Sequence, residues 1–296
     1  MSYLLTNKKI NLTLEEPGEN YSGSRFDWTG KIISLDYCGT EILSSELPMQ
    51  SDAQHKKFGR GLYNEFGTNN PLGFSECAIG GHFHKIGIGR IEKSKERYNN
   101  QLHHSVSPAE IKVIQKTNSI EFCIESRIIN GYGYHLNKHI KLQENGVTIS
   151  YILKNTGVKK LESNEYNHNF LCFGPSIIGP DYTLTLPTEI RLDELTELVN
   201  KEKVMSIKND EIRFLKTPTE AFFISTELKN RYVNAFWKLE NKALNIGISE
   251  TGNFKTRQFH LWGLEHVISP ELFIDIEINP SETKEWTRTY SFYELT

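Results

Sequence analysis

Residues 165–174 read EYNHNFLCFG, with one histidine between two asparagines at the mouth of an apolar run. An imidazole exchanges protons near neutral pH, so His168 is a candidate for proton transfer. Asn167 and Asn169 each donate and accept hydrogen bonds, which suits the lining of a polar pocket. The alternative is a turn, in which asparagines are common, and this segment alone leaves both interpretations open.

A carboxylate near the C-terminus offers a partner for such a histidine. Pro270 fixes the local backbone and removes a hydrogen-bond donor, and Glu271 follows it directly. The apolar segment LFIDIEI begins at Leu272, so Glu271 stands at the start of a predicted strand. A partly buried carboxylate in that position can act as a general base, whereas a solvent-facing one would be an ordinary strand-edge residue.

The segment GGHFHKIGIGRIE, residues 80–92, carries two histidines two positions apart. In a strand, His82 and His84 would point to the same face, as the imidazoles of some β-barrel metal sites do. Such sites also need a nearby carboxylate, and the next one, Glu92, lies beyond a glycine-rich stretch. No helix follows the glycines to form a phosphate loop. We therefore expect no metal and no other cofactor.

The segments that must position these residues show a period of two rather than 3.6. Alternating or β-branched and aromatic patterns predict strands at residues 31–37, 119–126, 139–153, 221–228, 243–250, 272–278 and 286–293. The Glu-Asn-Gly sequence at 144–146 predicts a hairpin, since Asn-Gly suits the turns that match strand twist. Helical spacing at residues 191–205 predicts one short helix. Many strands joined by short turns indicate an all-β sandwich or barrel in a single domain, residues 1–296.

Composition excludes several classes of function. The 34 basic and 37 acidic residues give a formal net charge of −3 without a basic stripe, so neither nucleic acid nor a membrane is an expected partner. The N-terminal apolar stretch is too short for a signal or a membrane span. Four widely spaced cysteines without a CxxC pair are expected to be reduced core thiols of a cytoplasmic protein.

Three segments in a fixed order, residues 21–43, 166–170 and 269–292, resemble the aldose 1-epimerase (galactose mutarotase) superfamily, and more narrowly its uncharacterised bacterial mutarotase-like branch. The first matches the loop and strand that precede the sugar site, and YNHNF matches the family's Asn-His motif. In the third, a glutamate precedes an apolar strand, a Pro-led turn follows, and the last strand ends in an aromatic residue. The resemblance implies a large twisted antiparallel β-sandwich with few short helices.

The resemblance also implies an activity, the interconversion of the α and β anomers of an aldose, with a small-molecule sugar as the partner. His168 would be the general acid that protonates the ring oxygen, and Glu271 the general base that removes the proton of the anomeric hydroxyl. Ring opening, rotation about the C1–C2 bond and reclosure then exchange the anomers without a cofactor. The expected substrate-binding residues are Arg60, His82, His84, Lys85, Asn167, Trp237 and Trp262.

Several alternatives stay open at the level of the sequence. Trp237 and Trp262 can stack on a sugar ring or pack in the core. A non-catalytic carbohydrate-binding domain on the same sandwich is the main alternative, because a fold does not fix a function. A metal-dependent sugar isomerase would use His82 and His84. A phosphorylated sugar would call for an arginine cluster, and the arginines are dispersed along the chain.

Overall fold

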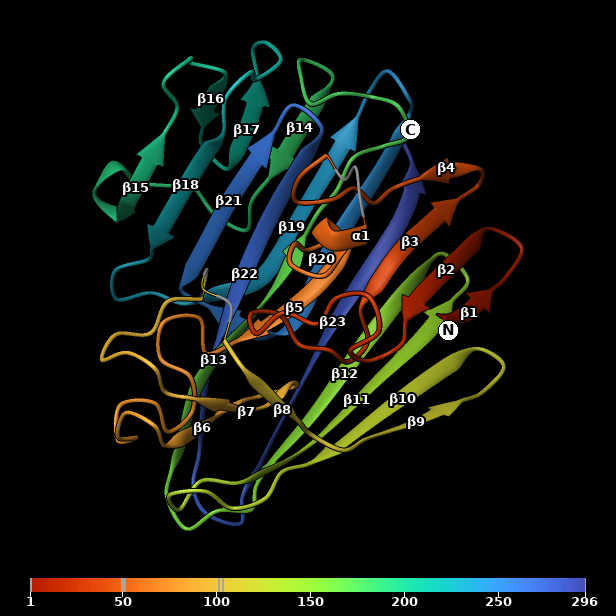
Figure 1. Cartoon of the computed structure of the whole chain (residues 1–296). Coiled ribbons are helices and arrows are strands. Elements are labelled where there is room, and N and C mark those ends of the chain that lie inside the picture. Colours follow the sequence, from red (N-terminus) through yellow and green to blue (C-terminus); the bar gives the residue numbers. More distant parts are fainter. Residues whose placement is uncertain (1, 49–51, 101, 103, 296) are drawn as a thin grey trace.

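The computed structural model describes residues 2–48, 52–100, 102 and 104–295, and the regular secondary structure of this described part consists almost entirely of strands (Figure 1). Two large antiparallel sheets pack against each other as a sandwich, and a small third sheet lies at one end. The alternation of apolar and polar residues explains the arrangement, because each large sheet buries one face in the shared core. The prediction of an all-β sandwich is confirmed.

The first large sheet carries His168 and Glu271. In spatial order its strands are β1 (Ser2–Thr6), β2 (Ile10–Glu15), β3 (Ile32–Tyr37), β5 (Leu62–Phe66), β13 (Leu161–Asn169), β22 (Val267–Ile278), β21 (Gln258–Leu264), β18 (Phe222–Glu227) and β15 (Leu195–Val199). A short strand, β4 (Thr40–Glu41), pairs with β3 outside this path. The helix α1 (Asp52–His55) lies in the connection between β4 and β5.

The second large sheet covers the other side of the core. In spatial order its strands are β16 (Met205–Lys208), β17 (Glu211–Phe214), β14 (Tyr182–Thr185), β19 (Val233–Asn241), β20 (Ile246–Thr256), β23 (Thr283–Glu294), β12 (Gly146–Asn155), β11 (Tyr134–Gln143), β10 (Ser119–Glu125) and β9 (Ile111–Gln115). The third sheet consists of β6 (His82–Lys85), β7 (Gly89–Glu92) and β8 (Val106–Pro108).

The predicted strands and hairpin are found in the structure. Every segment with a period of two contains a strand, although β20 starts later than the pattern and runs further, from Ile246 to Thr256. The predicted hairpin is formed by β11 and β12, whose register pairs Gln143 with Gly146 across the turn. Local alternation therefore identified the strands, while strand ends depended on pairing partners that are distant in sequence.

The predicted helix at residues 191–205 is wrong. Only a 3-10 turn, η1 (Leu192–Glu194), is helical, and the chain then continues as the edge strand β15. β15 pairs with β18, which satisfies backbone groups that a helix would have satisfied internally. The Glu194 carboxylate is buried against Arg231, with Oε2 at 2.5 Å from Nη2, and this fixes the turn. Tertiary pairing has overridden the local helical spacing.

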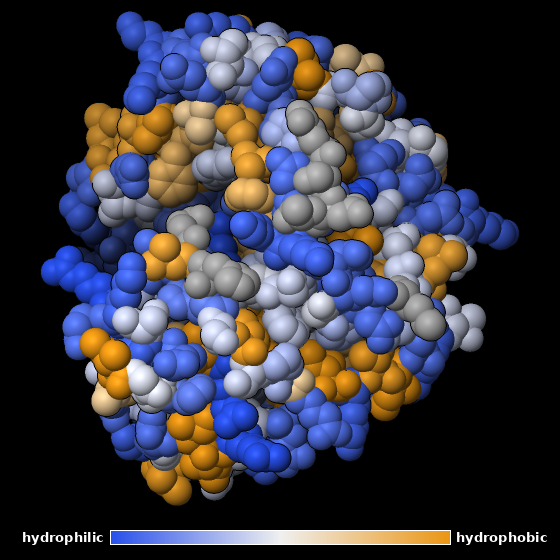
Figure 2. Space-filling view, viewed as in Figure 1, coloured by the Kyte–Doolittle hydropathy of each residue, from blue (hydrophilic) through white to orange (hydrophobic). Residues whose placement is uncertain are grey.

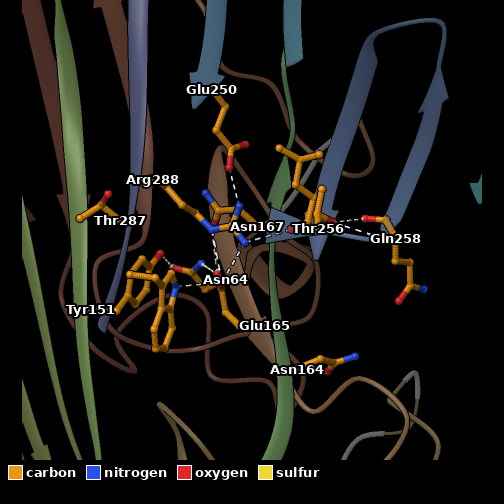
Figure 3. A network of polar contacts seen from close by, with 12 residues as sticks. Asn64, Tyr151, Asn164, Glu165, Asn167, Glu250, Thr256, Gln258, Thr287 and Arg288 are labelled. Atoms are coloured by element: carbon orange, nitrogen blue, oxygen red, sulfur yellow. Dashed lines mark hydrogen bonds and ion pairs between the residues drawn. The ribbon is translucent and has the colours of Figure 1, made fainter. Parts of the chain in front are cut away.

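A polar network crosses the interior between the two large sheets (Figure 3). At its centre the fully buried Arg288 of β23 bonds Glu165 of β13, with Nη2 at 2.8 Å from Oε2, and also contacts Glu250 of β20. Asn64 donates to Glu165 at 2.5 Å and accepts from the Tyr151 hydroxyl at 2.9 Å. Because these groups come from both sheets, the network fixes how the sheets lie against each other.

Within the described ranges, the chain contains no helix of the length and apolarity that a membrane span requires. All four cysteines are free thiols, and Cys77 and Cys172 are buried whereas Cys38 is exposed. The expectation of core thiols therefore holds for two of the cysteines and is wrong for Cys38.

Candidate active site

The end of β13 divides its side chains between the interior and a surface cavity. Tyr166 and His168 point to the cavity, whereas Asn167 and Asn169 point into the core, as expected for alternate positions of a strand. Asn167 donates to the Tyr290 hydroxyl at 2.5 Å, and Asn169 donates to Glu250 at 3.1 Å. The expectation that the two asparagines line a pocket with His168 is therefore corrected, because both belong to the interior network.

The cavity lies on the outer side of the first sheet and has a volume of about 250 Å³. We call it the candidate cavity, and it is lined by Arg25, Glu46, Thr68, Tyr166, His168, Phe223, His260, Trp262 and Glu271. On the face shown in Figure 2, apolar side chains gather over β15 and β18. Phe223 belongs to β18, and Trp262 belongs to the neighbouring strand β21. The structure thus brings together three of the expected site residues, His168, Glu271 and Trp262.

His168 and Glu271 are in direct contact. The His168 Nδ1 atom lies 2.9 Å from Oε1 of Glu271, and both residues are more than nine-tenths buried. The Ser269 hydroxyl accepts from the backbone N–H of Asn169 at 3.0 Å and donates to Glu271 Oε1 at 3.1 Å. The same hydroxyl oxygen lies 3.0 Å from His168 Nδ1, so Ser269 contacts both members of the pair.

Arg25 fixes the other side of the imidazole. Its Nη2 atom lies 3.0 Å from His168 Nε2, and since a guanidinium only donates, Nε2 must accept. This contact favours the tautomer of His168 that carries its hydrogen on Nδ1. The guanidinium is oriented by two carboxylates, Glu65 at 3.0 Å from Nε and Glu46 at 3.1 Å from Nη1. No local pattern in the sequence predicts this role, because Arg25 lies in the loop between β2 and β3.

The carboxylate of Glu65 in β5 holds three side chains of this region in place. Its buried carboxylate contacts Lys85 at 3.3 Å, Arg25 at 3.0 Å and the Tyr166 hydroxyl at 2.6 Å. Burial alone would raise the pKa of Glu65, but the charges of Lys85 and Arg25 outweigh burial and lower the pKa to about 2. The carboxylate is therefore ionised in the folded protein across the physiological range.

The lowered pKa of Glu65 predicts a stability that depends on pH. A carboxyl group whose pKa is depressed by folding stabilises the protein above its unfolded pKa and loses this contribution as pH falls towards its folded pKa. Between pH 5 and pH 2, wild-type protein should lose roughly 3 kcal/mol of unfolding free energy through Glu65. Urea unfolding at several pH values should show a shallower loss over this window for Glu65→Gln. Equal pH slopes for the two proteins would contradict the assignment.

His260 is a site residue that the sequence reasoning missed. It lies on β21 directly opposite Glu271 of β22, with Nδ1 at 3.8 Å from Oε2. Burial lowers the pKa of His260, although Glu271 acts in the opposite direction, so the ring is neutral at neutral pH. The signal was present in QFHLWGL, because His260 and Trp262 are two positions apart on one strand and must share a face.

The other expected substrate-binding residues do not line the candidate cavity. Trp237 is fully buried in the core and donates to Glu250 at 2.8 Å, so it offers no face to a sugar. Lys85 is buried and pairs with Glu65. The Nε2 atom of His84 lies 3.0 Å from the backbone oxygen of Tyr132. His82 and Arg60 also lie outside the cavity lining. Among the described residues, no group of His, Cys, Asp or Glu side chains has an arrangement that could hold a metal.

The expectations for Lys85 and His84 fail for a physical reason. Alternation along β6 turns Lys85 towards the interior, where the negative charge of Glu65 compensates its burial. His84 points to the opposite face of the same strand, and burial lowers its pKa. The HFHK segment therefore supports the site only through the Lys85–Glu65 pair.

This sandwich corresponds to the galactose mutarotase-like fold, and the resemblance seen in the sequence is confirmed at the level of fold. A candidate aldose 1-epimerase from Escherichia coli K12 superposes with a TM-score of 0.63 at 11% identity, over 100% of this chain and 99% of that chain. A galactose mutarotase-like protein from Clostridium acetobutylicum gives 0.61 at 9% identity, over 100% and 99%. An aldose epimerase homologue from C. elegans gives 0.57 at 12% identity, over the full length of both chains.

At the level of sequence, no protein family model matches the chain, and no curated protein matches it either. The similarity to the solved structures therefore concerns the fold, and function has to be argued from the residues of the cavity.

Proposed function

We propose that this chain is a carbohydrate-active isomerase of the aldose 1-epimerase type, which interconverts the α and β anomers of an aldose. The observation that carries the proposal is the contact of Glu271 with His168 at the floor of the candidate cavity. A carboxylate and an imidazole are the two groups that ring opening requires, one to take a proton and one to give it. Trp262 beside them offers an aromatic face of the kind that packs on sugar rings.

In the proposed reaction, Glu271 takes the proton of the anomeric hydroxyl while the bond between C1 and the ring oxygen breaks. The ring oxygen takes a proton from Nε2 of His168, so the reactive imidazole carries protons on both nitrogens. The Glu271 carboxylate next to Nδ1 stabilises that positive charge. Rotation about C1–C2 and the reverse transfers then give the other anomer, and both residues return to their starting protonation.

The contact between Arg25 and His168 adds a requirement to this reaction. Arg25 Nη2 occupies the hydrogen-bonding position of Nε2 in the unliganded protein. Two donors cannot share one hydrogen bond, so Nε2 can be protonated only when Arg25 has shifted to another acceptor. A sugar hydroxyl is such an acceptor. Once Arg25 donates to it, Nε2 of His168 takes up a proton from solvent, which couples substrate binding to the charging of His168.

The direct test is anomer exchange measured by NMR over a panel of free hexoses and pentoses. Catalysis predicts exchange at micromolar protein that is at least about a hundredfold faster than the spontaneous rate for one sugar. Heat-denatured protein serves as the control for trace buffer catalysis. Exchange at the spontaneous rate for the whole panel, and for disaccharides with a free reducing end, would overturn the proposal.

A second candidate function is a non-catalytic carbohydrate-binding protein on the same fold. One observation favours it, because both ring nitrogens of His168 already have protein partners, Glu271 and Arg25. Calorimetric sugar binding without any acceleration of anomer exchange would select this second function over the isomerase.

A further inference from the structure

A second cavity adjoins the candidate cavity. We call it the adjoining hollow; its volume is about 260 Å³, close to the 250 Å³ of its neighbour. Arg25 and Glu46 line both of them, so the two spaces meet at this pair of side chains. Each has room for one pyranose ring, and a single monosaccharide leaves one of the two unused.

The boundary between the two spaces is preorganised. Arg25 Nη1 lies 3.1 Å from Glu46 Oε1, and Glu46 Oε2 accepts from the backbone N–H of Gly59 at 2.8 Å. Arg25 is held further by the buried Glu65, at 3.0 Å. Since both side chains of the boundary have protein partners in the unliganded protein, the adjoining hollow exists before any ligand arrives.

The lining of the adjoining hollow suits a neutral polyhydroxylated ring. Phe58 contributes a partly exposed aromatic side chain, and Asn100 an amide that both donates and accepts. A sugar ring presents apolar C–H faces and hydroxyl edges, which need these two kinds of contact. Asn100 also donates to Glu65 at 3.3 Å, which holds it at the boundary between the hollow and the site.

The charges of the adjoining hollow argue against a phosphate or carboxylate in it. The Arg25 guanidinium is paired with Glu46 and Glu65, so little of its positive charge is available to an anion. The Glu46 carboxylate lines the same hollow and would repel one. Apart from Arg25, Lys57 is the only cationic side chain among the described lining residues. Phosphate recognition favours a cluster of arginines, which one lysine does not provide.

We infer that the substrate is a sugar with a free reducing end that carries a second neutral pyranose unit. The reducing unit occupies the candidate cavity at His168 and Glu271, and the second unit occupies the adjoining hollow against Phe58 and Asn100. This inference rests on the proposed function for the reducing unit. It extends that function from free monosaccharides to the reducing ends of disaccharides and longer glycans.

The test compares disaccharides of 1→4 and 1→6 linkage with their own reducing monosaccharides, using NMR anomer exchange. For the best disaccharide, kcat/KM should exceed that of its monosaccharide about tenfold, since the second unit adds a few hydrogen bonds and an aromatic contact. Phe58→Ala should bring this ratio close to one. The matched control Tyr232→Ala removes an exposed aromatic side chain that lines neither cavity, and it should leave the ratio as in wild type.

Two results would overturn the inference while leaving the proposed function intact. One is a ratio near one in wild type, and the other is a hexose 6-phosphate that is turned over better than every disaccharide. If no sugar is turned over, the proposed function fails, but the same ratio measured by calorimetry as Kd still tests the hollow. Tighter binding of the disaccharide, lost in Phe58→Ala, would then support it, and equal affinities would refute it.

Discussion

Replacing Glu271 by Gln is expected to lower the rate of catalysed anomer exchange about a hundredfold to ten-thousandfold, the range that one acid–base group contributes. Gln keeps the size of the side chain and can still accept the hydrogen bonds of Ser269 and of Nδ1 of His168. It cannot take the proton of an anomeric hydroxyl, and it does not stabilise a charged imidazole. The loss should therefore appear in kcat, measured by NMR exchange, with a far-ultraviolet circular dichroism spectrum like that of wild type.

The control for this variant is the same substitution at Glu265. This residue lies in the turn between β21 and β22, close to Glu271 in sequence but exposed and outside the candidate cavity. Glu265→Gln should retain full activity. If Glu271→Gln kept the wild-type rate on a sugar that wild type turns over, the carboxylate could not be the base, and His260 or a water molecule would have to replace it.

Replacing Arg288 by Met is expected to destabilise the folded protein by about 3–5 kcal/mol. Met fills a similar volume, but Glu165 and Glu250 then lose the cation that compensates their burial. Burial raises the pKa of Glu165 even with Arg288 present, and without it a buried carboxylate must either bind a proton or stay uncompensated. Urea unfolding at pH 7 measures the loss directly.

An exposed arginine provides the comparison for Arg288. Arg213 of β17 pairs with Glu211 at 2.7 Å, but its side chain is 68% exposed. Arg213→Met should cost at most about 1 kcal/mol, because solvent screens such pairs. Similar losses for the two variants would mean that the interior network contributes no more than a surface ion pair does.

Much of the fold was predictable because residues two positions apart share one face of a strand, so a half-buried strand shows alternating apolar and polar residues in the sequence. The hairpin of β11 and β12 and the strands around Glu271 follow from local alternation and turn residues. The segment that contains β15, residues 191–205, was not predictable in the same way. Its leucines have helical spacing, which locally favours a helix. The chain forms a strand because it pairs with the edge of β18, and the local sequence contains no information about that edge.

The candidate site was predictable in part, and the reasons differ from residue to residue. His168 and Glu271 were found from their residue types and their places at strand ends. Asn167 was misplaced, although the alternation used elsewhere would have turned it into the core. Arg25 could not have been found, because its approach to His168 depends on how a loop folds across the sheet.

Alternate side chains of β13 face two different environments, and this has a consequence for how such a chain can evolve. Tyr166 and His168 face the candidate cavity, while Asn167 and Asn169 are held by the interior network. Selection for a new substrate can therefore act on the even positions without disturbing the odd ones, on which the assembly of the two sheets depends. This chain shares its fold with solved structures that are only 9% and 12% identical to it in sequence. Such low identity is compatible with substitutions at the cavity-facing positions while the interior positions maintain the fold.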